Sequence, residues 1–490
     1  MLKRINLENF KGFESTGDLA LKPITILCGT NSSGKSTILQ SILLLKQSLE
    51  SKNPNQTLLL NGRYVHLGTF DNIIYGKTLD RNITFHFSLK YQKQETGLKK
   101  FGVPSLQISF RPLMSDDVRM TRPKEYLIDF KIQLKPQQKG LGISPIVNSF
   151  SSSISFISDQ NTILPGPKVS INREENGKYK LSWDNIRIRS DSGRMKSGTV
   201  GANFEFANLL VSEIDFLDTP KDNDKYFDVL YTIFRINDLI RNSMNFFTYI
   251  GPLREEPARR YIYEDETLEI GNKGENAAYL YLSEQDNLIA NYFSLKDNSF
   301  IKEPSVIKLK DAMMNWLNHM KITDLKPEPL SEIIYLNLAS GSSKDTRVNI
   351  ADVGFGVSQI FPIILEGVRM PTGNTLILEQ PEIHLHPNLQ MQMADFFISL
   401  ALANKNIIVE THSDHIINRL IRRIVEDKTY NLKELIGFYF IKTTDKGSVF
   451  EEVKIDDNSG ILNWPDDFFD QTAKEQEMIL RAGLNKHKPS

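Results

Sequence analysis

The stretch Gly29–Thr37 constrains this chain most, because it matches the phosphate-binding loop pattern G-x-x-x-x-G-K-[ST] without a mismatch. The apolar, β-branched run Ile24–Cys28 precedes it and predicts a buried strand. From Ser36 to Leu49, apolar residues recur at helical spacing. Strand, glycine-rich loop and helix is the order that lets backbone N–H groups surround a phosphate at a helix N-terminus.

Particular chemistry is expected of the residues in this loop. Lys35 would reach the β- and γ-phosphates of a nucleotide, and Ser36 would ligate Mg²⁺. A glycine-serine loop that fits by chance is the disfavoured alternative, because both flanks agree with the pattern. The expected cofactors are therefore ATP and Mg²⁺. The other nucleotide-contacting positions expected in the loop are Gly29, Asn31, Ser32, Ser33, Gly34 and Thr37.

Composition excludes some other classes of protein. The 490-residue chain has 59 Lys+Arg against 60 Asp+Glu, which is no global signature of a nucleic-acid binder, although local basic patches remain open. Cys28 is the one cysteine, so neither an internal disulfide nor a thiolate metal cluster can form. No apolar run is long enough to span a membrane, and Met1–Asn6 turns polar too soon for a signal peptide. A cytoplasmic protein without a membrane partner is expected.

The first half of the chain reads mainly as β-structure. Ile83–Leu89, Leu106–Phe110 and Tyr126–Leu134 alternate between apolar and polar residues, which predicts an antiparallel β lobe with one wet face. Residues 138–200 are rich in Ser, Gly, Asn and Pro and predict weak strands and mobile loops. The spacing of apolar residues from Phe204 to Phe247 predicts helix.

The C-terminal third alternates helices with short apolar strands, which predicts a parallel sheet covered on both faces. The expected helices and strands are Ser358–Val368, Thr375–Leu378, Pro387–Leu402, Ile407–Val409, Asp414–Val425 and Leu435–Ile441. Both ends of the chain then describe one α/β domain, split by a mixed α+β insertion. The expected division is residues 1–90 and 249–455 for the two halves of this domain, 91–248 for the insertion and 456–490 for a tail.

The C-terminal half offers what the phosphate loop still lacks. Glu379 ends the strand Leu376–Leu378 and would hold the Mg²⁺ water shell. The run Gly354–Gln359 opens a helix, whose N-terminus can offer backbone N–H groups and the Ser358 hydroxyl to a phosphate. Because the phosphate loop already covers its own nucleotide, this second site suits a nucleotide held by a partner subunit. Its expected contacts are Gly356, Ser358 and Gln359, and His412, after the next strand, could touch the γ-phosphate.

On these residues, together with Leu376–Pro387 and Thr411–Ser413, the chain resembles the ABC-type ATPase superfamily. The similarity is to the branch with SMC-like and OLD-like (overcoming lysogenization defect) heads. Within it, the chain is most like compact bacterial AAA-labelled ATPases with a C-terminal domain of unknown function. Tyr249–Arg254 and the tail Trp464–Asp470 also resemble that group, whereas residues 90–245 carry no matching motif. The resemblance implies a P-loop head with an antiparallel β lobe, hydrolysis of ATP to ADP and phosphate, and a homodimer or higher homo-oligomer.

The chain departs from the superfamily pattern at several positions. Gln380 stands where a catalytic glutamate is usual and cannot act as a base, so slow hydrolysis is expected. Glu382 is the nearest substitute, although it could equally cap the next helix. The usual Q-loop glutamine is missing, and Thr69 or Asp71 would serve instead. No TOPRIM-like acidic cluster follows His412, so the OLD nuclease is expected to be absent.

The resemblance implies bacterial DNA transactions, above all phage defence beside a separately encoded nuclease or other effector, with DNA as a possible ligand. A transporter ATPase subunit and a DNA repair clamp are the alternatives. The missing transmembrane stretch argues against the first, and the missing long coiled coil against the second.

Three weaker groups of residues remain. A zinc site at His384 and His386 with Glu379 and Glu382 is disfavoured, because no cysteine or separated third ligand supports it. A first group of basic residues could bind nucleotide or nucleic acid, or could equally pair with Glu255 and Glu256: Arg254, Arg259 and Arg260. A second group lies at helical spacing and is expected to form a solvated helix face: Arg419, Arg422 and Arg423.

Overall fold

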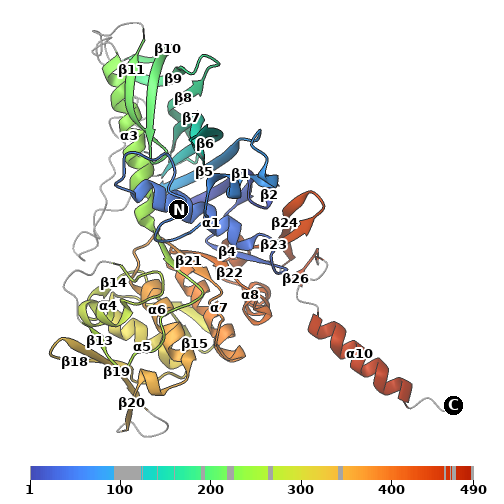
Figure 1. The fold of residues 1–490 in the computed structure, drawn as a ribbon. Coiled ribbons are helices and arrows are strands. Elements are labelled where there is room, and N and C mark those ends of the chain that lie inside the picture. The colour runs from blue at the N-terminus through green and yellow to red at the C-terminus, as the bar shows by residue number, and fades with distance from the viewer. Residues whose placement is uncertain are drawn as a thin grey trace.

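Two β-sheets organise the molecule, a computed structural model in which a wide antiparallel sheet adjoins a mainly parallel one (Figure 1). The structure describes residues 2–92, 123, 125–140, 142–158, 160–188, 194–217, 226–262, 269–339, 346–456, 460–463, 465 and 471–486. Within these ranges, no helix is long and apolar enough to cross a membrane.

The six-stranded sheet confirms the predicted parallel sheet. Its strands follow the order β12 (Phe247–Ile250), β21 (Thr375–Glu379), β22 (Asn406–Glu410), β4 (Ile24–Gly29), β23 (Ile436–Thr444) and β24 (Gly447–Val453). Only β24 runs antiparallel to its neighbour. Neighbouring residues of β4 face opposite cores, since Leu27 packs with the wide sheet while Ile26 and Cys28 pack with the C-terminal helices. Burial on both faces explains why these strands are continuous apolar runs.

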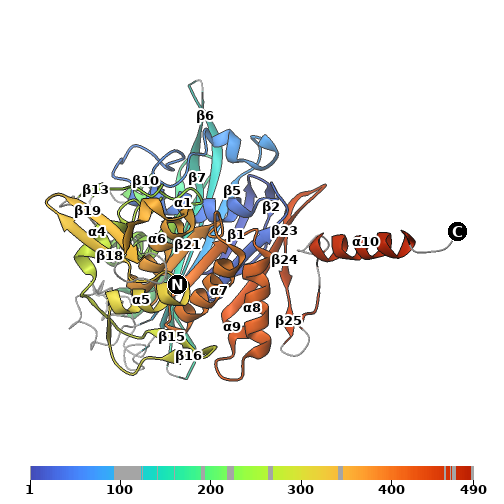
Figure 2. The ribbon, with the colours of Figure 1, turned by 90° about the horizontal axis from the view of Figure 1, so that it is seen from below.

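Helices cover this sheet on both sides. α1 (Lys35–Glu50) follows β4, and its leucines enter the core shared with the wide sheet. The opposite face carries α6 (Phe355–Arg369), α7 (Pro387–Leu402) and α8 (Asp414–Glu426). Figure 2 shows α7 and α8 side by side. The short α9 (Leu432–Leu435) leads into β23.

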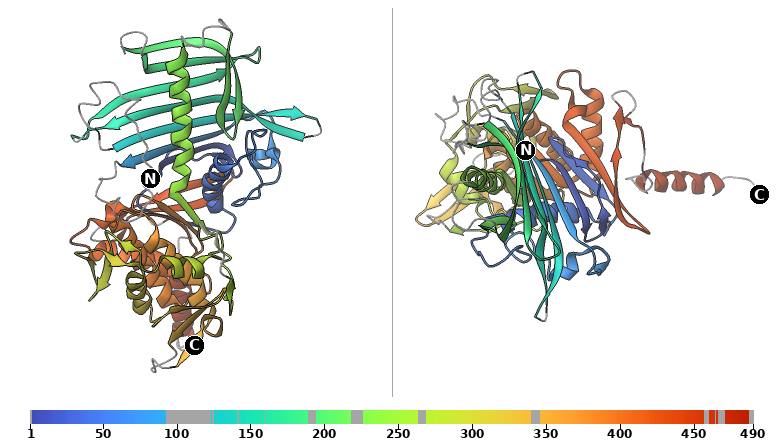
Figure 3. Two further views of the ribbon diagram at one scale, coloured as in Figure 1. Left: turned by 90° about the vertical axis from the view of Figure 1, so that its left-hand side faces the viewer. Right: turned by 90° about the horizontal axis from the view of Figure 1, so that it is seen from above.

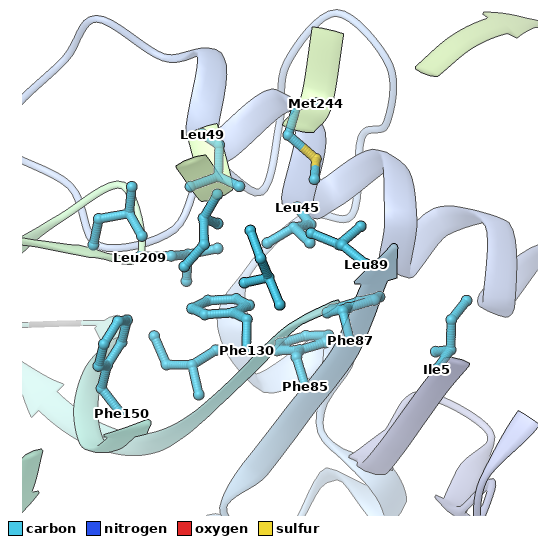
Figure 4. Close-up of a cluster of buried hydrophobic side chains, with 14 of the residues drawn as sticks. Ile5, Leu45, Leu49, Phe85, Phe87, Leu89, Phe130, Phe150, Leu209 and Met244 are labelled. Atoms are coloured by element: carbon cyan, nitrogen blue, oxygen red, sulfur yellow. The ribbon is translucent and has the colours of Figure 1, made fainter. Parts of the chain in front are cut away.

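The wide sheet is antiparallel with one buried face. Its strands follow the order β11 (Leu210–Phe216), β10 (Arg194–Ala207), β9 (Tyr179–Ile188), β8 (Ile163–Arg173), β7 (Gly142–Ile157), β6 (Glu125–Lys139), β5 (Ile83–Gln92), β1 (Leu2–Phe10) and β2 (Phe13–Ser15), with β3 (Leu19–Ala20) beside β1. Helix α3 (Phe227–Ser243) lies across these strands (Figure 3). Phe85, Phe130 and Phe150 fill the core beneath α1 and α3 (Figure 4).

Two predictions for this half of the chain are wrong. Residues 138–200, expected to form weak strands and loops, belong largely to the long strands β6 to β10. In β7, Phe150 and Ile154 face the core while Ser151 and Ser153 face outward, so the serine-rich composition hides a period of two. The helix expected from Phe204 is the β10–β11 hairpin up to Phe216, and α3 begins only at Phe227. The strand expected at 106–110 lies outside the described residues.

The structure also divides the chain differently from the expected boundaries. A boundary at residue 90 falls inside β5, whose residues Ile83–Gln92 pair directly with β6. The β lobe therefore includes β1, β2 and β5 and is not an insertion that begins at residue 91. The boundary at 248 falls inside β12, which pairs with β21. Inter-strand hydrogen bonding thus joins segments that the sequence motifs had separated.

A smaller α+β region lies between β12 and α6. It comprises β13 (Tyr261–Ile262), α4 (Ala277–Glu284), β14 (Leu288–Ile289), β15 (Phe293–Lys296), β16 (Ser299–Lys302), β17 (Ile307–Lys308), α5 (Leu309–His319), β18 (Lys326–Leu330), β19 (Ile333–Ala339) and β20 (Arg347–Asn349). Trp316 and Leu317 of α5 join it to the core of α6 and α7. After β25 (Ile455–Asp456) and β26 (Gly460–Ile461), α10 (Gln471–Lys486) projects from the body (Figure 1).

Helix α6 ends on a buried lysine that precedes β22. The Nζ of Lys405 donates to the carbonyl oxygens of Gly367 (2.9 Å) and Val368 (2.6 Å), which belong to the last turn of α6. These carbonyls have no partner within the helix, so the ammonium satisfies them. Burial lowers the pKa of Lys405 to about 7, although the Glu366 carboxylate opposes the shift.

Lys405→Met is expected to remove one pH dependence of stability. From about pH 7 up to the ordinary lysine pKa, the unfolded chain binds a proton that the folded chain does not, so the wild type gains stability as the pH rises. The gain approaches about 1.4 kcal/mol per pH unit. Urea unfolding at pH 7 and pH 9 should show the wild type gaining relative to the variant. The same change with pH in both proteins would contradict a lowered pKa.

Candidate functional site

The loop between β4 and α1 needs glycine at both ends of its motif. Gly29 has φ +146°, and a Cβ there would lie 2.0 Å from the carbonyl oxygen of Ile441 in β23. Gly34 has φ +103°, and a Cβ there would lie 3.1 Å from the ring of Phe13. These are left-handed conformations that glycine adopts without strain. The loop can therefore lie close to its neighbours and present the N-terminus of α1.

Lys35 and Ser33 are buried polar side chains of this loop. The Nζ of Lys35 donates to the carbonyls of Gly29 (3.1 Å) and Thr30 (2.7 Å), so the ammonium lies over the loop. Burial lowers the pKa of Lys35, which the Glu410 carboxylate opposes. The Oγ of Ser33 is buried, and within the described ranges it has no hydrogen-bond partner. An ammonium and a free hydroxyl among helix N-terminal N–H groups match the oxygens of a phosphate.

Around this centre the loop residues differ in exposure. The tip, Asn31 and Ser32, is exposed, and Ser32 has a left-handed backbone with φ +60°. Thr37 is buried, and its N–H donates to the carbonyl of Gly34 at 3.0 Å. The predicted loop residues therefore gather at one helix N-terminus.

Two carboxylates end neighbouring strands beside the loop. Glu379 of β21 and Glu410 of β22 are paired in the parallel register. The Ser36 hydroxyl donates to Oε1 of Glu410 at 2.9 Å, while Oε2 of Glu410 is buried and has no partner in the described part of the chain. Burial and the neighbouring Glu410 raise the pKa of Glu379 to about 7, against a hydrogen bond from Tyr249. The free Oε2 and the Ser36 hydroxyl fit a divalent cation that takes its remaining ligands from phosphate and water.

Sequence reasoning missed Glu410, although a signal was present. It directly follows the apolar strand residues Ile407–Val409, just as Glu379 follows Leu376–Leu378. Parallel strands end at the same edge of a sheet, so both acids had to lie at the phosphate-loop edge.

The loop after β21 joins β22 through its backbone and Glu382. Gln380 has φ +44°, and its N–H donates to the Glu410 carbonyl at 2.8 Å. Oε1 of Glu382 accepts the N–H of His412 at 2.6 Å, and Oε2 is buried with no hydrogen-bond partner among the residues that the structure describes. Partial burial and the Lys35 ammonium lower the pKa of His412.

The alternative that Glu382 caps the next helix is wrong. His386 caps α7 instead, because its Nδ1 accepts the N–H of Asn388 at 3.3 Å. The His384 ring lies 5.8 Å from the ring of Phe355. In the described part of the chain, no three His, Cys, Asp or Glu side chains are grouped to hold a metal ion.

The predicted second phosphate site at α6 contacts other partners. Ser358 Oγ donates to the carbonyl of Phe355 at 2.8 Å, and a Cβ at Gly356 would lie 3.3 Å from the carbonyl of His384. Gln359 accepts a hydrogen bond from Arg254. Among the described residues, no hydrogen bond joins this run to the loop of Gly29–Thr37. One chain therefore brings together Lys35, Ser36, Glu379, Gln380, Glu382, Glu410 and His412, but not Ser358.

The predicted roles of several basic residues are also wrong. Arg419 and Arg423 do not form a solvated face, because both bind the fully buried Asp395 of α7, at 2.7 Å each. Arg259 pairs with Asp352 rather than with Glu255 or Glu256. These ion pairs join residues far apart in sequence, which charge spacing alone cannot reveal.

The proposed Q-loop substitutes show only local contacts. Thr69 accepts a hydrogen bond from Asn72, and Asp71 accepts the N–H of Ile74 through its carbonyl. Both contacts stay within one turn. Nothing in them connects Thr69 or Asp71 to the phosphate loop.

Comparisons with known families add the following. A family model described as AAA ATPase domain matches residues 1–417. A second, described as protein of unknown function (DUF3696), matches residues 433–478. No curated protein matches the chain significantly.

Similar solved structures include three SMC heads. An SMC head domain from Thermotoga maritima has a TM-score of 0.38 at 9% identity and covers 93% of this chain and 99% of its own. An SMC head bound to the C-winged helix domain of ScpA has a TM-score of 0.38 at 9% identity, with 93% and 98% covered. One with an extended coiled coil, bound to the C-terminal domain of ScpA derived from Pyrococcus furiosus, has a TM-score of 0.33 at 9% identity, with 98% and 99% covered.

Proposed function

The chain belongs to the AAA ATPase domain family, and from that premise we propose that this ATP-binding ATPase is a switch that closes head to head, as a dimer, on two ATP molecules. The carrying observation is the division of the phosphate-binding features. Lys35 and Ser36 lie with Glu379 and Glu410, whereas Ser358 at the N-terminus of α6 bonds elsewhere. A twofold dimer would let each α6 N-terminus meet the partner's nucleotide.

Each side chain in the first group has a proposed role. Lys35 and the free hydroxyl of Ser33 bind phosphate oxygens. Ser36 and Glu379, with Glu410, hold Mg²⁺, which when bound neutralises charge on the β- and γ-phosphates. The unpartnered Oε2 of Glu410 supports this fit.

Slow hydrolysis is part of the proposal. Gln380 can orient a water molecule without accepting its proton, as a glutamine does in small GTPases. Glu382 is the proposed substitute base, since it stands two residues after Gln380 and its Oε2 has no hydrogen-bond partner in the described structure. His412 lies close by, because its N–H donates to Glu382. The ATP-bound closed form should therefore be long-lived, which suits a sensor.

The biological setting proposed is bacterial defence against phage, in the cytoplasm, beside a nuclease or another effector. It rests on the resemblance of Leu376–Pro387, Tyr249–Arg254 and the tail to the OLD-like branch. DNA is a further possible ligand. Affinity purification of the tagged protein from its native cell, with and without ATP, tests this setting. If no effector co-purifies either with or without ATP, that result would argue against this setting.

Mixing two inactive variants tests the shared site. Lys35→Ala removes the phosphate-loop cation, and Ser358→Arg blocks the α6 N-terminus. A mixed dimer holds one site in which both groups are intact, so mixing should restore part of the ATPase rate. Each variant alone at the same total concentration is the control. A mixture that stays as inactive as its parents after subunit exchange would refute the shared site.

A further inference from the structure

We propose that Arg254 is a positioning residue that links the N-terminus of α6 to the backbone of Gln380. The inference rests on the proposed function, because it assigns the α6 N-terminus to the partner's nucleotide. It adds a route by which that nucleotide affects hydrolysis at the chain's own phosphate loop.

Arg254 reaches both elements with one guanidinium. It follows β12 and is buried, with 5% of its surface exposed. Its Nε donates to Oε1 of Gln359 at 3.1 Å, in the first turns of α6. Its second terminal nitrogen donates to the carbonyls of Gln380 (3.3 Å) and Pro381 (3.4 Å). The planar fork of arginine allows these bonds at fixed angles, which a lysine ammonium cannot reproduce.

Burying this guanidinium costs more desolvation free energy than a purely structural contact between α6 and the loop would require. In the described structure its hydrogen-bond acceptors are an amide and backbone carbonyls, not carboxylates. Burial lowers the pKa of Arg254 to about 10, against the attraction of the Glu382 carboxylate. An apolar side chain would fill this space without desolvating a charge. What it would lose is the connection between α6 and the loop after β21.

The backbone of Gln380 is held from both sides. Its N–H donates to the carbonyl of Glu410 in β22, and its own carbonyl accepts from Arg254 and from the N–H of Ile383. Its φ of +44° is a left-handed conformation, which costs a non-glycine residue free energy and persists only where neighbours enforce it. A shift of Gln359 therefore changes one of the three bonds that fix Gln380, and of these three only the bond from Arg254 connects it to α6. Engagement of α6 by the partner's nucleotide would hold Gln359, and through Arg254 the water-orienting residue.

Arg254→Lys tests this link, because it keeps the charge but loses the fork. We expect kcat for ATP to fall by about 10- to 100-fold, as misplacement of a reacting geometry by about 1 Å does. ATP affinity of the dilute protein should stay within about twofold, because in the described structure none of the hydrogen bonds of Arg254 reaches the phosphate loop. In the wild type, the ATPase rate per subunit should rise with protein concentration as dimers form. In Arg254→Lys this rise should be smaller. Arg259→Lys, an exposed arginine paired with Asp352, is the matched control and should change none of these quantities.

Gln359→Met removes the other end of the link and serves also if Arg254→Lys does not fold. It should lower kcat by a similar factor, and the double variant should be no slower than the slower single variant. Multiplied effects in the double variant would overturn the link. An unchanged kcat would also overturn it. So would a fall in ATP affinity as large as the fall in kcat, accompanied by a loss of thermal stability.

The wild type separates failure of this inference from failure of the proposed function. A wild-type rate per subunit that does not depend on protein concentration refutes the shared site and the inference with it. A wild type that depends on concentration, beside an unaffected Arg254→Lys, refutes the role of Arg254 alone.

Discussion

Gln380→Glu should speed ATP turnover by at least about tenfold, because it supplies a base where the chain has an amide. A base placed on the attacking water contributes on the order of 10²–10⁴-fold. The backbone of residue 380 is fixed by Glu410 and Arg254, so the new carboxylate should occupy the position of the amide. Steady-state phosphate release at saturating ATP and Mg²⁺ measures the effect. Gln380→Asn, which adds no base, is the matched control and should not be faster than the wild type.

The same assay examines Glu382 as the substitute base. Glu382→Gln keeps the shape of the side chain and an oxygen for the His412 N–H, but it removes the carboxylate. Turnover should then fall below the slow wild-type rate. A fast wild type that Glu382→Gln leaves unaffected would contradict both the slow rate and the role of Glu382. His412 would then be the next residue to test.

The parallel half of the fold was predictable because strands that are buried on both faces are continuous apolar runs in the sequence. The helix expected at Pro387–Leu402 has those bounds in the structure, and β22 extends the expected Ile407–Val409 by one residue at each end. The predicted strand omits the last residue of β22, Glu410, because the prediction ended with the apolar run. The strand end is where the chemistry lies, because the side chain there leaves the apolar core and faces the phosphate loop.

The antiparallel half was less predictable because its outward face is polar. In β7, serines alternate with core residues, and composition alone resembles a loop. The helix period expected from Phe204 failed because the β10–β11 turn, with left-handed Asn208 and Leu209, lies inside that run. A pattern of apolar residues interrupted by a tight turn fits more than one period.

The partners of charged side chains were the least predictable feature, because the sequence shows which residues are adjacent along the chain but not which are adjacent in space. Arg254 bonds to Gln359 and Gln380 rather than to Glu255, and Arg423 bonds to Asp395. Such contacts depend on which elements the two sheets bring together. The phosphate loop escaped this difficulty because its ligand-binding groups are consecutive in sequence.

Equilibrium binding of a fluorescent ATP analogue to the wild type and to Lys35→Ala tests the central claim most directly. Lys35 is buried over the loop and has no carboxylate within hydrogen-bond distance in the described structure. Each hydrogen bond from a charged donor is worth about 1.5–3 kcal/mol, so losing two should weaken binding by at least about 100-fold. Lys310→Ala, which removes an exposed lysine paired with Asp286, should bind like the wild type. A folded Lys35→Ala protein that binds the analogue as tightly as the wild type would contradict the claim that Gly29–Thr37 is the ATP site.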